Sequence, residues 1–454
     1  MTTRSMAGIA VLVAILFTAG NEVAAATLHV SQTSTNPKPP YAAWNTAAPT
    51  IQEAVDAARD GDTVLVAAGE YRLTNQITIT KAILLQSDMG SEQTVVNAQD
   101  DYLGPKRCLR ILNSDATVDG FTLRNGNGTP DGGGGAFMVG GTVQNCTIQS
   151  CYSWPENGTA GGVAMVGGML SNCIVKGTIF GIAVSCSSGG LVTDCQIVDN
   201  RFASANGGVY LRQSELRNSI ISWNRCFGVG GGVFAISSRI LGCTMTNNLS
   251  FQAGGGAYLD GCEMDRCFIA KNRVCMFEGS GDGGGIFATN SVIRNSLIVS
   301  NLTCESSYEG PSFGGGVYLS GGSLLNCTVS GNTSGTGAGV YVENGAVRNS
   351  IVYFNSKFNS PAESNWDNGG GGSFDYSCTT PVPVGVGNIA EDPQFVDQTN
   401  GDYHLTPTAP CIDAGINEAW MLGAYDLDGN PRIHRGNAGT VDMGAYESKY
   451  IPAP

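Results

Sequence analysis

One pattern occurs nine times between Gly132 and Asn355: a glycine cluster, a short apolar strand, a polar turn, and a second strand that begins near Asn-Cys or Asn-Ser. The first residue after each glycine cluster recurs about every 25 residues. Self-similarity at such a period indicates a solenoid in which each repeat is one supersecondary unit. Helical repeats would need apolar residues at helical spacing, which these segments lack. The sequence therefore predicts an all-β, single-stranded parallel β-helix solenoid.

The first strand of each repeat has an alternation that assigns its side chains to two faces. Successive side chains of a strand point to opposite faces. Positions one and three after the glycines are small or aliphatic, so they are predicted to point inward. Position two then points outward, and seven of the nine repeats have an aromatic residue there. This aromatic column consists of Phe137, Tyr210, Phe234, Tyr258, Phe287, Tyr318 and Tyr341, with Ala164 and Ala183 in the other two repeats.

The aromatic column has two interpretations. Stacked rings stabilise neighbouring strands, and a loop could cover them. An exposed line of rings could instead be a platform for sugar rings, because large exposed apolar patches mark binding surfaces. The sequence leaves both interpretations open.

Two further columns are predicted to be structural. The second strand begins with a cysteine or serine in each repeat, and a small residue there suits a tight interior corner. The turn that follows carries asparagines, whose amides can bond to the next asparagine of the stack. An asparagine in such a ladder, Asn248 for example, would not be free for glycosylation although Asn248-Leu249-Ser250 matches the sequon. The first column is Cys146, Cys173, Cys195, Ser219, Cys243, Cys267, Ser296, Cys327 and Ser350, and the second is Asn200, Asn224, Asn248, Asn272, Asn301, Asn332 and Asn355.

Insertions suggest where a binding face could lie. Three repeats are longer between the ladder asparagine and the next glycine cluster, at residues 151–160, 273–282 and 302–313. Insertions on one side of a solenoid commonly form its binding face. We therefore expect Glu278, Asp282 and Tyr308 beside the aromatic column. Arg225 and Arg273 each follow a ladder asparagine and could form a short basic row, although solvated turn residues are the simpler account.

The N-terminus predicts export. Arg4, an apolar run over residues 7–17 and small residues up to Ala26 are the features of a secretory signal peptide, with cleavage expected after Ala25 or Ala26. The run is too short for a membrane anchor, and no later apolar stretch is long enough to span a bilayer. We expect a secreted or cell-surface protein. Its net charge of −14 gives no electrostatic attraction to nucleic acid.

The remaining chain divides into four expected parts. Residues 27–62 should form an extended segment and a short helix that begins at the capping box Thr50-Ile51-Gln52-Glu53. Such a helix can close the end of a β-helix, whose strand edges would otherwise be unpaired. Coils are predicted over residues 63–355 and a glycine-rich loop over residues 356–380. A different module should follow over residues 381–454.

That module contains three short strings, Asp402-Tyr403-His404-Leu405, Pro410-Cys411-Ile412-Asp413-Ala414-Gly415 and Asp442-Met443-Gly444-Ala445-Tyr446-Glu447. They resemble the bacterial choice-of-anchor Q module. The repeats resemble the right-handed parallel β-helix proteins of the pectin-lyase-like superfamily. This resemblance implies right-handed coils, and the superfamily includes lyases, hydrolases and esterases, so the fold alone does not give the reaction.

Fifteen cysteines in an exported chain predict some disulfides and at least one free thiol. Cys275 and Cys304 each fall three residues after a ladder asparagine, so stacking would bring them together. Cys378 precedes the C-terminal module and Cys411 lies inside it, and a bond between them would tether the module.

No metal or other cofactor is expected. The three histidines are isolated, and no zinc-ligand spacing occurs. The string from Asp426 to Asn430 is better explained as an Asp-Gly turn, with Arg432 paired to a nearby acid, than as a calcium loop.

The sequence lacks the catalytic strings of polygalacturonases and pectate lyases. The double aspartate Asp100-Asp101 lies before the regular repeats and has no companion motif. The leading hypothesis is recognition of an extracellular polysaccharide along the aromatic column, with its cleavage left open. The alternative is a catalytically silent surface or adhesion protein. A carboxylate pair beside the column would favour cleavage.

Overall fold

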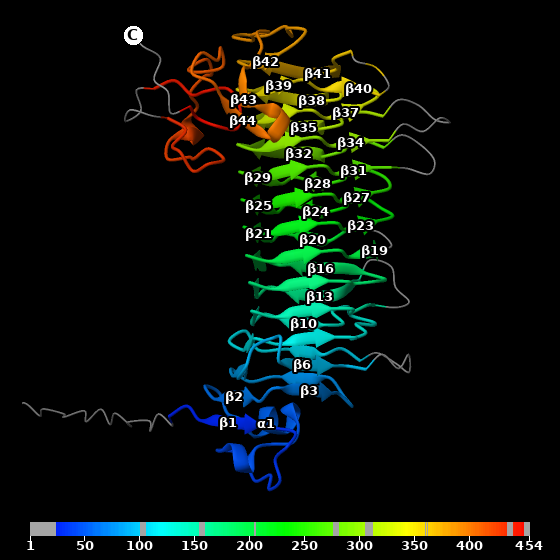
Figure 1. Cartoon of the computed structure of the whole chain (residues 1–454), viewed down its shortest axis with the longest axis vertical. Helices are drawn as coiled ribbons and strands as arrows, with labels where there is room; N and C mark the ends of the chain where they lie inside the picture. The colour runs from blue at the N-terminus through cyan, green and yellow to red at the C-terminus, as the bar shows by residue number, and fades with distance from the viewer. Residues whose placement is uncertain are drawn as a thin grey trace, which may run out of the picture.

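A computed structural model of the chain describes residues 24–99, 106–153, 159–203, 206–275, 281–304, 312–358, 360, 362–433 and 439–448. The segment up to residue 23, with most of the expected signal peptide, lies outside them. Short strands wind into a rod of stacked parallel coils, with the C-terminal module against its upper part (Figure 1). This confirms the predicted parallel β-helix.

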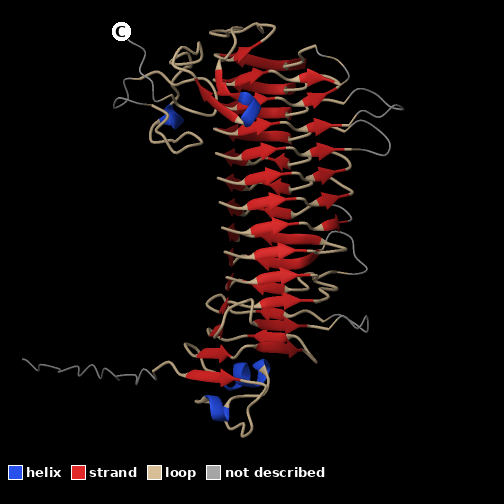
Figure 2. Ribbon diagram, viewed as in Figure 1, coloured by secondary structure: helices blue, strands red, loops and turns tan. Residues whose placement is uncertain are grey.

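The described residues contain very little helix (Figure 2). The helix α1 spans Ile51–Ala57, and the 3-10 turns are η1 (Trp44–Thr46), η2 (Gln398–Asn400) and η3 (Ala419–Met421). The Thr50 hydroxyl accepts the backbone N–H of Glu53 at 3.3 Å, which is the predicted N-cap. Ile51, Ala54 and Val55 are buried against the first coils.

The coils contribute strands to three parallel sheets that run along the rod. The 22-stranded sheet has two arms. Arm 1 contains β4 (Ile77–Ile79), β7 (Leu109–Ile111), β10 (Ala136–Val139), β13 (Ala160–Val166), β16 (Ile182–Ser187), β20 (Val209–Arg212), β24 (Val233–Ile236), β28 (Ala257–Asp260) and the first parts of β32 (Ile286–Arg294), β35 (Val317–Leu325), β38 (Val340–Arg348) and β41 (Trp366–Asp375). Arm 2 contains β1 (Thr27–Val30), β2 (Thr63–Val66), β5 (Leu84–Ser87), β8 (Thr117–Asp119), β11 (Thr142–Gln144), β14 (Met169–Ser171), β17 (Leu191–Thr193), β21 (Glu215–Arg217), β25 (Arg239–Leu241), β29 (Glu263–Asp265) and the second parts of the four long strands.

Two more sheets complete the coils: a 13-stranded sheet runs along the rod, and a 7-stranded sheet accompanies its later coils. With strands about 4.8 Å apart, thirteen coils make a rod about 60 Å long. The 13-stranded sheet contains β3 (Gly69–Arg72), β6 (Thr94–Asn97), β9 (Thr122–Arg124), β12 (Thr147–Gln149), β15 (Ile174–Lys176), β18 (Gln196–Val198), β22 (Ile220–Ser222), β26 (Thr244–Thr246), β30 (Phe268–Ala270), β33 (Leu297–Val299), β36 (Thr328–Ser330), β39 (Ile351–Tyr353) and β42 (Cys378–Thr379). The 7-stranded sheet contains β19 (Arg201–Ala203), β23 (Arg225–Cys226), β27 (Leu249–Ser250), β31 (Arg273–Val274), β34 (Leu302–Thr303), β37 (Thr333–Ser334) and β40 (Ser356–Lys357).

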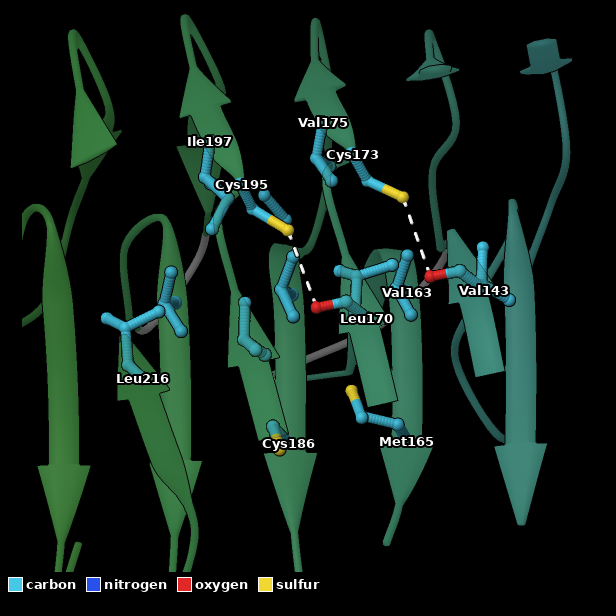
Figure 3. Packing of buried hydrophobic residues seen from close by; sticks show 14 of the residues in the cluster. Val143, Val163, Met165, Leu170, Cys173, Val175, Cys186, Cys195, Ile197 and Leu216 are labelled. Carbon is cyan, nitrogen blue, oxygen red and sulfur yellow. Dashed lines mark hydrogen bonds between the residues drawn. The ribbon is translucent and has the colours of Figure 1, made fainter. Parts of the chain in front are cut away.

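The predicted cysteine/serine column is buried in the coil interior. Its side chains accept backbone N–H groups from the preceding coil, as when the Ser296 hydroxyl accepts the N–H of Cys267 at 3.1 Å. The thiols in turn donate to carbonyls, for example Cys173 to Val143 and Cys195 to Leu170, each at 3.6 Å (Figure 3). This exchange explains why only Cys and Ser recur, because a larger side chain would not fit and alanine could not bond.

The asparagine ladder is also confirmed. The Asn272 amide donates to the Asn301 side chain and to the Met245 carbonyl, at 3.0 and 2.8 Å, and Asn272 is fully buried. The same bonds repeat in each coil and continue to Asn365 beyond the predicted end. Because Asn248 is 1% exposed and bonded in the same way, its sequon is not accessible.

The structure differs from the sequence interpretation in two segments. Ile182 is not the first position of its repeat: Val184 pairs with Val209, so the outward residue is Ser185 rather than Ala183. A bulge in the pairing of β13 with β16 adds one residue to β13 between Ala160 and Val163. Residues 356–380, predicted as a loop, form one more coil through β40, β41 and β42. Its glycines Gly369 to Gly372 lie within β41, and Gly372 lies so close to the Val342 side chain that a Cβ there would clash with it.

The C-terminal module packs on the 13-stranded sheet of the upper coils. It contains the antiparallel pair β43 (Phe395–Asp397) and β44 (Asp402–Leu405). Tyr403 is buried in a cluster with Leu297 and Val299 of the coils. Arg432 is fully buried and pairs with Glu447 at 2.8 Å, so the prediction of an acid partner for this arginine is correct.

Candidate functional site

The aromatic column lies on arm 1. Parallel pairing places Tyr210, Phe234, Tyr258, Phe287, Tyr318 and Tyr341 opposite one another in successive strands. All six side chains are half-buried, and the neighbouring buried residues point inward. Ring centroids of neighbours are 4.6 to 5.5 Å apart. The parity argument therefore placed these six rings correctly in one line.

The rings stack on each other face to face. The interplanar angle is 7° between Tyr258 and Phe287 and 12° between Phe287 and Tyr318. Each ring thus covers the faces of its neighbours and turns its edge to solvent. The idea of a flat platform of ring faces is wrong for this stretch, and the surface offered is a line of ring edges and tyrosine hydroxyls.

The column is interrupted at Ala164 and Ser185, which separate Phe137 from Tyr210. Ala164 is 9% exposed because the backbone of Gly132 lies over it. A ring at that position would collide with the crossing chain. Phe137 lies beneath two guanidinium groups instead, of Arg107 at 5.3 Å and Arg110 at 5.8 Å from the ring centre.

Arg107 and Arg110 were missed by the sequence interpretation. They lie in the irregular coils before the regular repeats, where no column could be read. The available signal was local: Lys106, Arg107 and Arg110 bring three cations within five residues of an otherwise acidic chain.

Carboxylates gather at the other end of the column. Burial raises the pKa of Asp282 to about 6, although the backbone N–H of Phe313 donates to it at 3.0 Å. The Glu343 carboxylate accepts the Ser320 hydroxyl at 2.6 Å. Burial, and then the charge of Glu343, raise the pKa of Tyr318. The predicted Asp282 is thus beside the column, in a common electrostatic environment with Glu343 and Tyr318.

The predicted arginines lie elsewhere. Arg225 and Arg273 belong to the 7-stranded sheet and not to arm 1. The Arg225 guanidinium lies 4.9 Å from the centre of the Phe251 ring. Arg273 donates to the sulfur of Cys304 at 3.6 Å. Glu278 and Tyr308 lie outside the described residues.

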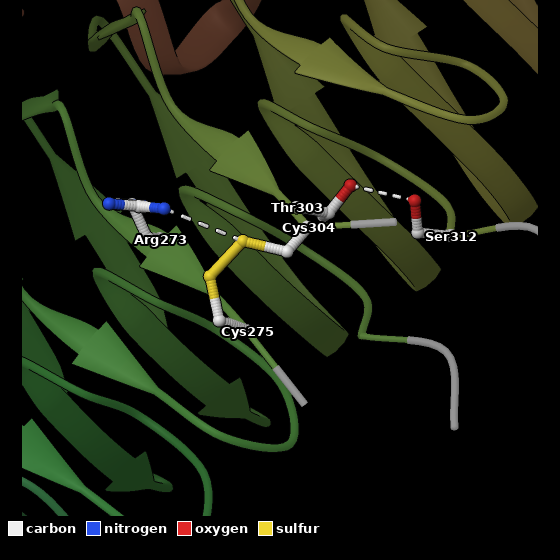
Figure 4. The surroundings of a disulfide bond; sticks show 5 residues. All are labelled: Arg273, Cys275, Thr303, Cys304 and Ser312. Carbon is white, nitrogen blue, oxygen red and sulfur yellow. Dashed lines mark hydrogen bonds between the residues drawn. A yellow bond between two sulfur atoms is a disulfide. The ribbon is translucent and has the colours of Figure 1, made fainter. Parts of the chain in front are cut away.

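The structure contains a disulfide between Cys275 and Cys304, with the Cα atoms 4.9 Å apart (Figure 4). It joins two adjacent coils where insertions 273–282 and 302–313 leave the 7-stranded sheet. Beside it, the Thr303 hydroxyl donates to that of Ser312 at 2.9 Å. These bonds fix the base of two insertions next to the column.

Cys378 and Cys411 are free thiols in the structure, although a bond between them was expected. Both are buried in one cluster where the module meets the coils. The Cys378 thiol donates to the carbonyl of Glu391 at 3.2 Å, and a hydrogen bond to Cys378 raises the pKa of the Cys411 thiol. The two residues are therefore neighbours in the reduced form, and their bond stays a prediction.

The comparisons with known proteins give one partial family match and several distant structural matches. The family described as periplasmic copper-binding protein (NosD) matches residues 139–323, less than half of the chain. No curated protein matches the chain. Among solved structures, pectate lyase Pel9A has 15% identity and a TM-score of 0.41, with 94% of this chain and 98% of that chain covered. The A-module of the mannuronan C-5 epimerase AlgE6 from Azotobacter vinelandii has 16% identity and a TM-score of 0.41, with 76% and 95% covered. A mannuronic-acid-specific lyase from human gut microbiota has 9% identity and a TM-score of 0.32, with 68% and 86% covered.

The described residues of this chain offer no site for the copper that the name of the matched family implies. Within the described residues no group of three or more His, Cys, Asp or Glu is arranged to hold a metal ion. The cysteines of the inward column do not fit either, because they are buried in the coil interior and burial raises the pKa of a thiol such as Cys267 well above its usual value. We therefore assign no metal to the site. Over the same described ranges, no helix is long and apolar enough to cross a membrane.

Proposed function

We propose that the chain is an exported protein that binds an extracellular polysaccharide along arm 1 of the β-helix. The observation that carries this proposal is the unbroken line of six half-exposed rings. In the described part of the chain, the N-terminal segment pairs at the end of the rod and the C-terminal module packs on the 13-stranded sheet, so neither covers arm 1. Export is supported by the features of residues 1–26 and by the disulfide.

The chemistry of the line suits an extended sugar chain. Ring edges are apolar, and the hydroxyls of Tyr210, Tyr258 and Tyr341 can donate to or accept from sugar hydroxyls. The repeat of the coils gives similar contacts at regular spacing. Affinity would then come from several weak contacts in a row rather than from one deep pocket.

Cleavage is the second candidate, because Asp282 and Glu343 interact electrostatically at one end of the column and the pKa of Asp282 is raised. With a pKa of about 6, Asp282 holds its proton to higher pH than an ordinary aspartate. Glycoside hydrolysis needs one carboxylic acid and one carboxylate on either side of the bond. A catalytically silent adhesion protein remains the alternative, and it requires binding without turnover.

The proposal is tested by the double variant Tyr210→Phe/Tyr258→Phe, which keeps the ring stack and removes two hydroxyls. Binding to an array of extracellular polysaccharides, followed by titration of the best oligosaccharide, should weaken by about 5- to 100-fold, because each neutral hydrogen bond contributes about 0.5–1.5 kcal/mol. Tyr425→Phe, at a half-exposed tyrosine of the C-terminal module, is the matched control. Equal affinity of the double variant and the control would contradict binding along the column. Reducing-end release by the wild-type chain, lost in Asp282→Asn, would establish cleavage.

A further inference from the structure

A polar hollow of about 490 Å³ opens near the N-terminal end of arm 1. It adjoins the aromatic column, because Thr78 in its wall pairs with Arg110, which pairs with Phe137. Within the part of the chain that the structure describes, its lining has no carboxylate and consists of Thr74, Asn75, Gln76, Thr78, Lys106, Arg107, Asn127, Thr129 and Pro130.

Arg107 is built into the wall of this hollow. Its side chain is 7% exposed, and its Nη2 donates to the carbonyls of Gly128 and Gly132 at 3.0 and 3.2 Å. These bonds hold the loop that crosses the column. Among the described residues the nearest acid is Asp131, half-exposed and 3.7 Å away, and the Nε of Arg107 has no hydrogen-bond partner there. A buried cation with weak compensation makes the local potential positive.

The amides of the wall are oriented as donors. The Gln76 side-chain oxygen accepts from Arg107 Nη1 at 3.4 Å. The Asn127 side-chain oxygen accepts both the backbone N–H and the hydroxyl of Thr129, at 3.2 and 3.0 Å. Because protein donors already occupy the two oxygens, the NH₂ groups of both amides are left to face a ligand. Donors and cations together are the chemistry of an oxyanion site.

We infer that the hollow is an anion subsite of the glycan-binding face, and that it takes a sugar residue bearing a carboxylate or a sulfate ester. This inference rests on the proposed function and adds the substrate class. The hollow is large enough for one sugar unit. A chain with a net charge of −14 would otherwise repel an acidic polymer, so a local cationic end lets an acidic sugar enter the face.

The variant Gln76→Glu tests the inference with little risk to the fold. A glutamate oxygen can still accept from Arg107, while the donor NH₂ is replaced by a negative charge. Gln196→Glu, on the exposed outer face of the 13-stranded sheet, is the matched control. Lys106→Gln is a second variant, which removes a positive charge from another part of the lining of the hollow.

The full chain is titrated with three probes: a hexuronic acid tetrasaccharide, its carboxyl-reduced counterpart, and that counterpart carrying O-sulfate groups. We expect the acidic or the sulfated probe to bind at least about tenfold more tightly than the reduced one, since charge-assisted hydrogen bonds are about twice as strong as neutral ones. Gln76→Glu and Lys106→Gln should abolish this difference and leave the reduced probe unchanged. Whichever charged probe shows the difference identifies the group.

The possible failures are distinct. If the reduced probe binds and the charged probes bind no better, or if Gln76→Glu behaves as Gln196→Glu does, the anion subsite is overturned and the proposed glycan face stands. If none of the probes binds and the wider polysaccharide array is also negative, the proposed function falls, and the subsite falls with it. Circular dichroism and melting of each variant show that a loss of binding is not a loss of fold.

Discussion

Replacing Arg432 by methionine should detach the C-terminal module from the coils without unfolding them. Arg432 is fully buried between the two parts. It donates to Asn295 of the coils at 2.8 Å and to the Asn326 carbonyl at 3.3 Å. On the module side it donates to Glu447 at 2.8 Å and to the carbonyls of Gly444 and Ala445, both at 3.0 Å. Methionine fills much of the volume and makes none of these bonds.

The free-energy cost of this substitution follows from the buried groups that lose Arg432 as a partner. Glu447 is buried and would lose its only cationic partner in the described residues. Removing one partner of a buried ion pair costs about 3–5 kcal/mol, because a charge stays buried without compensation. This corresponds to an increase of about 100- to 4,000-fold in the population with the module undocked. Arg348→Met is the matched control, since that arginine also joins the coils to the module but is 37% exposed, so its loss should cost about 0–1 kcal/mol.

Hydrogen exchange followed by mass spectrometry reports the undocking directly. Amides of residues 395–447 should lose protection in Arg432→Met, while amides of β28 and β30 keep theirs. Burial raises the pKa of Glu447 to about 8 although Arg432 lowers it, so without Arg432 the buried acid is tolerated only when protonated. Arg432→Met/Glu447→Gln should recover much of the protection. Unchanged exchange of the module in Arg432→Met would refute this reasoning.

Three further predictions follow from the same structure. In the wild-type chain, docking of the module should weaken as pH rises from 4 to 8, because the folded pKa values of Asp442 (about 6) and Glu447 (about 8) are raised above the ordinary values of 3.8 and 4.5. The stability that these two acids contribute is fully present below their unfolded pKa values and is lost as pH rises through their folded pKa values. A thermal transition of the module that is as stable at pH 8 as at pH 5 would contradict this prediction. Asn272→Ala should cost about 3–5 kcal/mol, because it leaves several buried partners unsatisfied, and denaturant unfolding that matches an exposed control such as Asn344→Ala would show that the ladder is dispensable. Under oxidising conditions Cys378 and Cys411 should form a disulfide, and peptide mapping without reductant that finds both thiols alkylated would exclude it.

The repeat made most of the fold predictable, because in a parallel stack one register decides every coil. Once Val233 was assigned inward, Phe234 had to point outward, and the same held for Ala257 and Tyr258. The cysteine/serine and asparagine columns were readable for the same reason. The assignment failed at Ile182, next to a one-residue bulge in the pairing of β13 with β16, since a local insertion changes the register without changing the composition.

Features that depend on orientation or on distant segments were not readable. A sequence shows that Phe287 and Tyr318 are neighbours in a column, but the angle between their rings is set by packing in three dimensions. The docking of Arg432 against Asn295 joins residues 137 positions apart that share no pattern. The glycines from Gly369 to Gly372 suggested a loop, yet Phe374 beyond them is buried and completes a coil.

The division between regular and irregular coils also bears on where chemistry can evolve. A position in a stacked column is constrained by the coil above and the coil below, so a change at Phe287 disturbs Tyr258 and Tyr318 as well. The first coils lack such columns, and there Arg107 and Gln76 differ from anything in the repeats. A side chain free of a column can be replaced without breaking a stack. Specificity for a particular sugar is therefore expected in the irregular end of arm 1, while the regular part of the column supplies affinity that depends little on which sugar is bound.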